Sequence, residues 1–171
     1  MYKLYKYENA IIKYVVEASV SIIIDYMPLK MFQKRLRQNE NISFKEKVLR
    51  FYFAVITGGK AEIWFACDTI SGSIIHCSYC IPKCYKFPFL SSNEYEIGPC
   101  NTIISMRGNK IYPAVISEII KVHDSANAFY MIVDKNNISS QHGIKRSGFK
   151  LIGVVQKTKL FKIYKKMEAR D

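Results

Sequence analysis

The sequence has no run of about 18 apolar residues, the length that a membrane-spanning helix requires. Its apolar stretch from Ala10 to Ile24 is interrupted by Lys13 and Glu17, so a secretory signal is not expected. Repeats, low-complexity tracts and linkers are also missing, and 49% of the residues are apolar, which excludes a disordered chain. We therefore expect residues 1–171 to form a single domain of a cytoplasmic protein.

Acidic residues are few compared with basic ones. The chain has 14 Asp and Glu against 26 Lys and Arg, which gives a net charge of +12. This excess favours a polyanionic partner: nucleic acid, an anionic membrane surface or a phosphate-rich small molecule. Lys157, Lys159, Phe161 and Ile163 alternate in a stretch expected to be a strand, but the sequence has no recognised nucleic-acid motif and no unbroken basic block. Nucleic acid is therefore disfavoured as a partner.

The five cysteines lack the arrangement of a typical zinc site. Cys77-x-x-Cys80-x-x-x-Cys84, with His76 beside it, resembles a metal cluster, but zinc usually takes its ligands from two separate knuckles and no second knuckle is present. A strand over residues 73–81 would also send Cys77 and Cys80 to opposite faces. We therefore expect reduced cysteines that act as small apolar residues, and no bound metal.

The first half of the sequence predicts strands joined by tight turns. Leu49–Thr57 is rich in aromatic and β-branched residues, which favours a strand, and Gly58-Gly59 supplies the positive φ angles that a hairpin requires. The other elements expected here are a strand in Ile11–Val16 or Val20–Ile24, a helix over Leu29–Arg37 after Pro28, a short helix from the capping box Ser43–Glu46, and strands over Lys60–Cys67 and Ser73–Ile81.

The second half alternates predicted strands and helices. A strand over Glu94–Ser105 is interrupted by Gly98-Pro99, where we expect a bulge or splay because proline cannot donate to a ladder. The order predicts an α/β fold with a mixed, mostly antiparallel sheet and helices on both faces. The elements that follow are a helix over Pro113–His123, a strand over Ala128–Val133, a helix over Ser139–Ser147 and closing strands within Lys150–Tyr164.

Residues 107–112, Arg-Gly-Asn-Lys-Ile-Tyr, connect the interrupted strand to the next helix. This segment resembles the Arg/Gln-x-x-Gly-x-Gly/Ala turn of the GNAT superfamily of N-acetyltransferases. Lys110 and Tyr112 replace the two motif glycines; Lys110 adds a positive charge but lacks the freedom of glycine at positive φ. The resemblance implies that backbone amides hold the pyrophosphate of coenzyme A, as a helix N-terminus holds an anion. The residues involved would be Arg107, Gly108, Asn109, Lys110, Ile111 and Tyr112.

A second segment strengthens the resemblance. Asn137-Ile138-Ser139-Ser140 and Gly148-Phe149 match the family pattern of Asn-x-x-Ala/Ser, a short helix, a glycine and an aromatic residue. By resemblance, Asn137 would lie beside the pantetheine arm and Ser140 near the phosphate end of the coenzyme. The same residue types are also ordinary helix caps and stops. The two segments together, with a helix and a strand between them, are therefore more informative than either alone.

The resemblance implies transfer of an acetyl group from acetyl-CoA to a primary amine, which must lose a proton to attack. Glu96 is our first candidate for the general base and His142 the second. Backbone amides at Ile103 and Ile104 would polarise the thioester carbonyl. Cys100 is a candidate acyl-carrying nucleophile, although direct transfer is the norm of the family.

The proton donor for the departing thiolate is open. Many family members have a tyrosine four residues before the glycine of the second segment, and this chain has Ile144 there. Tyr112, Tyr130 and Cys100 are the substitutes that we consider.

We therefore expect an acetyl-CoA-dependent N-acetyltransferase that acts on a small-molecule amine. The positive charge suggests an anionic acceptor such as an amino sugar or a sugar nucleotide. Residues 94–102 resemble a bacterial branch of the superfamily. The alternatives are a coenzyme A-binding or regulatory module without catalysis and, third, a basic nucleic-acid-binding protein. The resemblance leaves a homodimer open.

Overall fold

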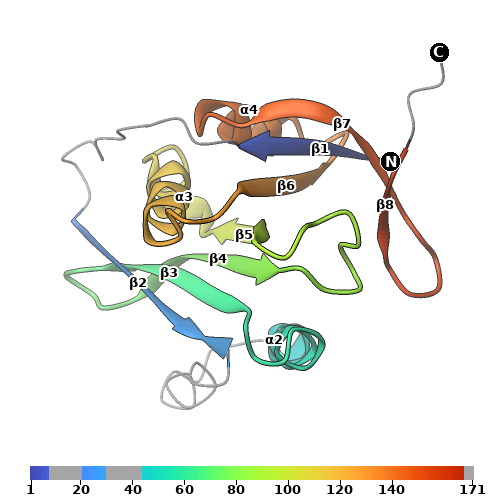
Figure 1. Cartoon of the computed structure of the whole chain (residues 1–171). Coiled ribbons are helices and arrows are strands. Elements are labelled where there is room, and N and C mark those ends of the chain that lie inside the picture. Colours follow the sequence, from blue (N-terminus) through green and yellow to red (C-terminus); the bar gives the residue numbers. More distant parts are fainter. Residues whose placement is uncertain (8–20, 30–43, 168–171) are drawn as a thin grey trace.

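The computed structural model describes residues 1–7, 21–29 and 44–167. Its strands form an eight-stranded sheet in the order β2-β3-β4-β5-β6-β1-β7-β8 (Figure 1). The strands are β1 (Tyr2–Tyr7), β2 (Ile22–Pro28), β3 (Glu62–Asp68), β4 (Ile74–Pro82), β5 (Glu94–Thr102), β6 (Ala128–Asp134), β7 (Lys150–Lys157) and β8 (Tyr164–Lys166). The helices are α2 (Phe44–Ile56), α3 (Ile111–Val122), α4 (Ile138–Arg146) and a short 3-10 helix, η1 (Ile104–Met106).

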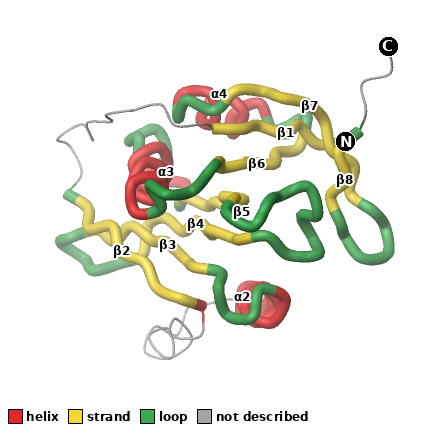
Figure 2. The backbone as a smooth tube through the Cα atoms, in the orientation of Figure 1, coloured by secondary structure: helices red, strands yellow, loops and turns green. Residues whose placement is uncertain are grey.

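The sheet is mixed, as expected. β5 and β6 pair in parallel, and the other neighbouring strands pair antiparallel. α3 connects the two parallel strands, which is the crossover predicted between them. Figure 2 shows that α3 and α4 both follow loops at the carboxyl ends of β5 and β6.

β5 and β6 separate after only three paired positions. Their register runs from Glu94 opposite Ala128 to Glu96 opposite Tyr130, whereas β5 continues to Thr102. The register between β5 and β4 also shifts between Ile97 and Cys100. The interruption predicted at Gly98-Pro99 is therefore present, and it opens the edge of β5 that β6 no longer covers.

Helices cover both faces of the sheet, as expected. On one face, Val115 and Ile119 of α3 and Ile144 of α4 pack against Phe129 and Met131 of β6. On the other face, Phe53 of α2 packs in a second cluster with Phe65, Tyr79 and Phe87. α3 and α4 therefore lie on one face of the sheet and α2 on the other. Among the described helices, none combines the length and the apolar character needed to cross a membrane.

The largest error of the sequence prediction concerns Leu49–Thr57: its residues up to Ile56 belong to helix α2 and not to a strand. Strand propensity depends strongly on context, and here helical contacts oppose it. Arg50 pairs with Glu46 at 2.8 Å and i,i+4 spacing, and Phe53 of the same helix is fully buried. The predicted short helix and the predicted strand are thus a single helix.

Gly58 and Gly59 end this helix instead of forming a hairpin. Both have positive φ, and their N–H groups donate to the carbonyls of Val55 (3.2 Å) and Ala54 (2.7 Å). These bonds satisfy carbonyls that the helix end leaves free. The same glycine preference for positive φ serves both turn types, so the sequence alone could not separate them.

Other differences concern the ends of the chain. β1 was not predicted, although Leu4, Tyr5 and Tyr7 are buried and the strand lies between β6 and β7. The strand expected in Val20–Ile24 overlaps β2, the alternative Ile11–Val16 lies outside the described residues, and so does the helix over Leu29–Arg37 apart from Leu29. The remaining strands and helices agree with the predictions within a few residues.

Residues 157–163 do not form a single strand with basic side chains on one face. β7 ends at Lys157 and β8 begins at Tyr164, so Lys159, Phe161 and Ile163 lie in the connection between them. Their predicted alternation along one strand is therefore wrong.

Candidate functional site

A cavity of about 1240 Å³ lies where β5 and β6 diverge. One end is lined by β5, the turn that follows it, and the beginnings of α3 and α4. The other end is lined by Leu49 and Phe53 of α2, Lys86 and Phe87 of the loop after β4, and Tyr164 of β8. The N-termini of two helices and a group of aromatic side chains therefore line the same cavity.

The turn before α3 adopts the backbone geometry that its glycine-rich counterpart would favour. Gly108 has φ +91°, and Lys110, which caps α3, lies in the left-handed region at φ 57° and ψ 15°. The first intrahelical bond of the turn runs from the Ala114 N–H to the Lys110 carbonyl at 3.2 Å. The Ile111 and Tyr112 N–H groups come before this bond, in the first turn of α3, where a helix N-terminus binds anions. Pro113 contributes none, because it lacks an N–H.

Arg107 lies at the start of this turn. Its Nε donates to the carbonyl of Thr102 at 3.1 Å, so its exposed side chain is fixed against the end of β5. Arg107, Gly108, Lys110, Ile111 and Tyr112 line the cavity. Asn109 does not, and its side-chain amide donates to Met106 instead at 3.3 Å.

The second predicted segment lies across the cavity from the first. Asn137 caps α4, and its Oδ1 accepts the Ser140 N–H at 3.1 Å. Both residues line the cavity. The two motifs that were thirty residues apart in the sequence are therefore brought to the same cavity, and the capping role of Asn137 is observed directly.

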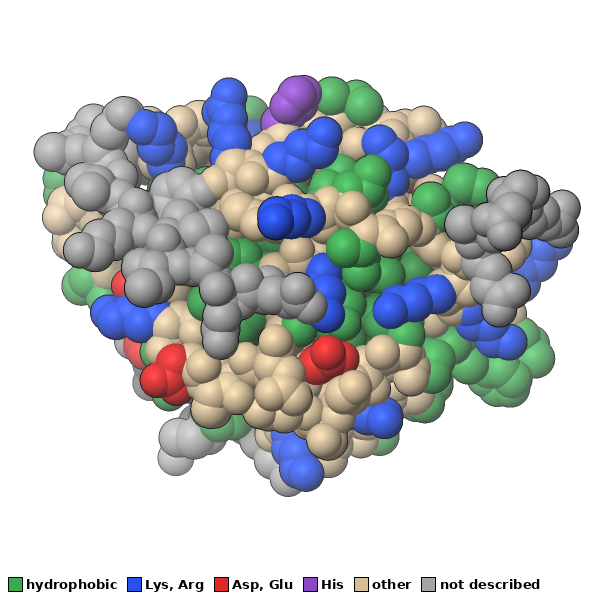
Figure 3. Space-filling view, turned by 45° about the horizontal axis from the view of Figure 1, so that its top comes forward, with side chains coloured by type: hydrophobic (Ala, Val, Ile, Leu, Met, Phe, Trp, Pro, Cys, Tyr) green, Lys and Arg blue, Asp and Glu red, His purple; other side chains and the backbone are tan. Residues whose placement is uncertain are grey.

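Positive charge dominates the cavity wall. Five basic side chains line it, whereas the acidic ones are Glu96 and Asp134. In Figure 3, Lys and Arg side chains spread over the side of the molecule at the top of Figure 1, around apolar side chains, and acidic side chains are few. Such a wall favours a ligand that carries several phosphates. The basic residues are Lys86, Arg107, Lys110, Arg146 and Lys157.

Glu96 is a buried carboxyl in the wall of the cavity. It is 5% exposed, and its Oε2 has no hydrogen-bond partner in the described part of the chain. Burial raises the pKa of Glu96 to about 8, and the positive charge of Lys86 acts in the opposite direction. Gly98 leaves room for this side chain, because a Cβ there would lie 2.8 Å from Glu96 Oε1. A carboxyl of this kind can exchange a proton near neutral pH.

Lys86 was not predicted as a site residue. Its Nζ lies over the rings of Phe53 (4.6 Å), Phe87 (5.3 Å) and Tyr164 (5.9 Å). Burial lowers its pKa, while the carboxylate of Glu96 raises it. The aromatic rings thus hold a partly desolvated cation in the cavity. The dense aromatic loop around Lys86 was visible in the sequence, but no local pattern assigns it a function.

Cys100 lines the cavity but is poorly suited to nucleophilic attack. Burial raises the pKa of its thiol to about 12, although a hydrogen bond with Ser78 opposes the shift. A thiol with such a pKa has little thiolate at neutral pH, and nucleophilic cysteines normally have lowered pKa values. The candidate role of Cys100 as an acyl carrier therefore conflicts with its environment.

The position of Ile103 and Ile104 also differs from the one expected of amides that polarise the thioester carbonyl. The Ile103 N–H donates to the Ile75 carbonyl at 3.0 Å, which extends the contact between β4 and the end of β5. Neither Ile103 nor Ile104 lines the cavity. The open edge of β5 lies earlier, between Ile97 and Thr102, where the strand has separated from β6 and lines the cavity.

Tyr112 occupies the position of the second motif glycine and fills the space between α3, β6 and α4. Its hydroxyl donates to Met131 Sδ at 3.5 Å, and burial holds its pKa well above the usual range. A Cβ at Gly143 would lie 3.0 Å from the Tyr112 ring. Gly143 thus provides the space that the bulky residue requires.

The other candidate acids and bases differ in position. His142 is exposed on α4 and lines the cavity, whereas Ile144 is buried there in the place where the family often has tyrosine. Tyr130 does not line the cavity, and its hydroxyl donates to Glu94 at 3.2 Å. Tyr112 is therefore the candidate tyrosine that the structure brings to the cavity.

Comparison with known proteins identifies the fold. No family model matches the sequence, and no curated protein matches it significantly. Among solved structures, a GNAT-family acetyltransferase from Staphylococcus aureus is 17% identical with a TM-score of 0.54, and the match covers 77% of this chain and 86% of that one. Two further matches are longer proteins, of which this chain spans 52% and 57%.

Two other solved structures have similar lengths. Glucosamine-6-phosphate N-acetyltransferase from Arabidopsis thaliana is 16% identical over 82% of this chain and 99% of that one, with a TM-score of 0.54. A predicted acetyltransferase from Clostridium acetobutylicum, solved with acetyl-CoA, is 17% identical over 82% and 97%, with a TM-score of 0.55. The chain therefore has the GNAT acetyltransferase fold.

Proposed function

We propose that this protein is a GNAT-superfamily N-acetyltransferase that transfers an acetyl group from acetyl-CoA to a primary amine of a small molecule. The observation that carries the proposal is the buried Glu96 carboxyl, whose Oε2 has no hydrogen-bond partner among the described residues, in a cation-lined cavity at the separation of β5 and β6. The fold and the two coenzyme motifs support the donor, and Glu96 supports chemistry in addition to binding. The fold alone would not support a catalytic role, since one fold can serve unrelated functions.

The coenzyme would lie along the turn before α3 and the cap of α4. The backbone amides of Gly108 and Ile111 would bind its pyrophosphate, and the side chain of Lys110 would add a positive charge. Asn137 and Ser140 would lie beside the pantetheine arm and the phosphate end. When bound, the coenzyme would supply an activated acetyl thioester.

Glu96 would act as the general base. An ammonium group has no free electron pair, so the carboxylate, directly or through a water molecule, accepts a proton as the amine nitrogen attacks the acetyl carbonyl. The open edge of β5 between Ile97 and Thr102 would supply backbone dipoles to the carbonyl oxygen. His142, which lines the same cavity, is the second candidate for the base.

Tyr112 would protonate the departing thiolate. Its raised pKa keeps the hydroxyl protonated at neutral pH, and it lines the cavity together with Glu96. The proton passes from the phenol to sulfur as the carbon–sulfur bond breaks. Tyr112 would thus be the proton donor in this chain, whereas many family members have a tyrosine for this purpose at the position of Ile144.

The acceptor would be an amine that also carries an anionic group. Lys86 and Lys157 line the end of the cavity opposite the coenzyme turn, and the rings of Phe53, Phe87 and Tyr164 surround the Lys86 cation. A phosphate or carboxylate on the acceptor would pair with these lysines, and the aromatic walls would contact its carbon framework. An amino-sugar phosphate combines these features.

The test combines binding and turnover. Acetyl-CoA that binds only the native state should raise the melting temperature, since occupancy at about 100 times Kd stabilises by about 2.7 kcal/mol. Release of the free thiol of coenzyme A should then depend on an added amine, and glucosamine 6-phosphate should react faster than glucosamine. A shift without turnover on any amine would support a coenzyme-binding module instead. Absence of both effects would overturn the proposal.

A further inference from the structure

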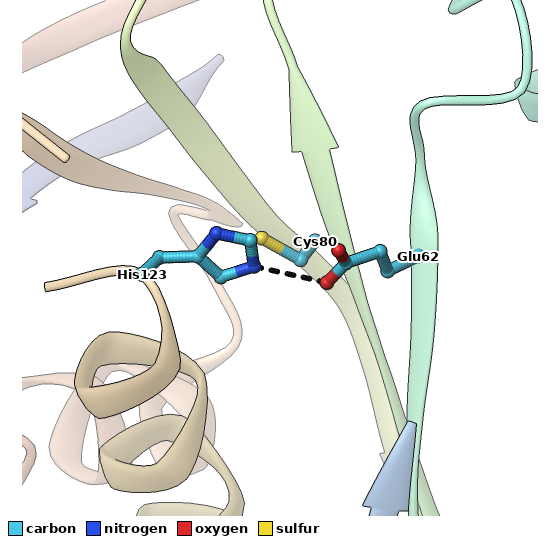
Figure 4. A group of neighbouring side chains, drawn as sticks. All are labelled: Glu62, Cys80 and His123. Carbon is cyan, nitrogen blue, oxygen red and sulfur yellow. Dashed lines mark hydrogen bonds and ion pairs between the residues drawn. The ribbon is translucent and has the colours of Figure 1, made fainter. Parts of the chain in front are cut away.

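A second cluster of chemically reactive side chains lies outside the cavity, at the opposite end of α3. Glu62 of β3, Cys80 of β4 and His123, the residue after α3, point toward one another (Figure 4). Their donor atoms all lie within 4.8 Å of each other, and His123 Nε2 is 2.9 Å from Glu62 Oε2. None of the three lines the acetyl-transfer cavity.

The cluster is held in place by its surroundings. Glu62 and Cys80 are paired residues of neighbouring strands, so the sheet fixes their separation. The Trp64 indole N–H donates to Glu62 Oε2 at 2.9 Å and orients the carboxylate. The rings of Tyr95 (4.8 Å) and Trp64 (6.4 Å) lie beside the His123 imidazole. Such outer contacts are what fixes the ligands of protein metal sites.

We propose that Glu62, Cys80 and His123 bind a zinc ion. Thiolate, imidazole and carboxylate are the three ligand types that zinc accepts, and three protein ligands leave a fourth tetrahedral position for water. Calcium and magnesium prefer oxygen ligands, so a site with sulfur and nitrogen donors selects against them. Cys80 is 1% exposed, whereas the side chains of Glu62 and His123 are 19% and 17% exposed, so an ion would enter from their side.

Zinc binding would replace the present contacts of Cys80, His123 and Glu62 by bonds to the ion. The Cys80 thiol releases its proton to solvent as the sulfur–zinc bond forms, and the hydrogen bond between His123 and Glu62 is replaced by bonds from both groups to the ion. The ion would connect the carboxyl end of α3 to β3 and β4. Because α3 begins at the coenzyme turn, the site would anchor the helix from its far end without entering the cavity.

The experiment measures zinc on the purified full-length chain by isothermal titration and by metal analysis after gel filtration. We expect about one zinc per chain, and a higher melting temperature with zinc than with a chelator. Cobalt(II) in the same site should produce a thiolate-to-metal charge-transfer absorption band, which reports on Cys80 directly. Failure of the wild-type chain to bind zinc, or cobalt binding without that band, would overturn the proposal.

Matched variants locate the site. Cys80→Ser, His123→Ala and Glu62→Gln should each weaken zinc binding by more than about tenfold, which is the low end even for outer-contact changes at zinc sites. Cys77→Ser is the control, because Cys77 lies on the same strand but packs on the other face. Glu62→Gln keeps the acceptor for Trp64, so its fold is retained and circular dichroism can verify this. Equal zinc loss in Cys77→Ser, or full binding in Glu62→Gln, would contradict the assignment.

Discussion

The two ends of the cavity are built in different ways. The proposed coenzyme end consists of turns and helix N-termini, with backbone amides and exposed basic side chains. The proposed acceptor end consists of aromatic side chains from α2, the loop after β4 and β8, which lie around the cation of Lys86. A ligand bound by backbone amides keeps its contacts when a side chain is substituted, whereas a ligand bound by side chains loses them. We therefore expect the affinity for the coenzyme to withstand most side-chain substitutions and the acceptor end to determine which substrate reacts.

Glu96 lies between the two ends, and its removal should have the largest effect. Glu96→Gln keeps the size of the side chain but cannot accept the proton of the amine, so kcat/KM should fall by about 10²–10⁴. In the wild type, kcat/KM should rise with pH and level off above about 8, because the base must be deprotonated. The variant should lose this rise in a pH-rate profile.

Two measurements separate catalysis from folding in this variant. Glu118→Gln, a change of a partly exposed side chain on α3, should leave both rate and pH profile unchanged. The pKa of Glu96 is raised from 4.5 to about 8, so its contribution to stability is full below pH 4.5 and is lost as pH rises to about 8. Urea denaturation should therefore show Glu96→Gln gaining stability relative to wild type across that window. A constant difference would mean that the carboxyl is not buried in solution.

Tyr112→Phe tests the proton donor at the coenzyme end. The ring still packs on Gly143, but the thiolate loses its acid, so kcat should fall by about 10²-fold with little change in the KM for acetyl-CoA. Tyr130→Phe removes a hydroxyl that bonds to Glu94 outside the cavity and should leave kcat near the wild-type value. Equal rates for Tyr112→Phe and wild type would assign the proton to water.

Lys86→Met tests the acceptor end alone. The variant retains an apolar stem among the aromatic rings but loses the cation, so kcat/KM for an amino-sugar phosphate should fall by about tenfold or more, given about 1.5–3 kcal/mol for a charge-assisted hydrogen bond. The rate with the unphosphorylated amino sugar should change little. Lys83→Met, an exposed lysine of the same loop, is the control. Equal losses for both acceptors would show that Lys86 does not select the anion.

The same contrast explains what the sequence could predict. The coenzyme end is formed by contiguous segments, so the strand–turn–helix order and the cap at Asn137 follow from local patterns, whereas the positive φ of Lys110 is found only in the structure. The acceptor end depends on α2, whose aromatic residues favour a strand by propensity, and on Lys86, whose partners come from distant elements. The Glu62, Cys80 and His123 cluster is equally non-local, which is why the cysteine spacing indicated no metal.

Substitutions of Lys110 should have the smallest effect. A comparison of glycine and alanine at this position tests the backbone geometry alone, because both remove the same charge. Its left-handed conformation costs about 1–2 kcal/mol in a residue with a Cβ, and glycine removes that cost. Lys110→Gly should therefore be more stable than Lys110→Ala by about 1 kcal/mol in urea denaturation, after allowing for the greater freedom of glycine in the unfolded chain. Both variants lose the same charge and should weaken acetyl-CoA binding to the same small extent. If Lys110→Ala were the more stable of the two, the turn would not adopt this geometry, and the coenzyme end would rely on side chains as the acceptor end does.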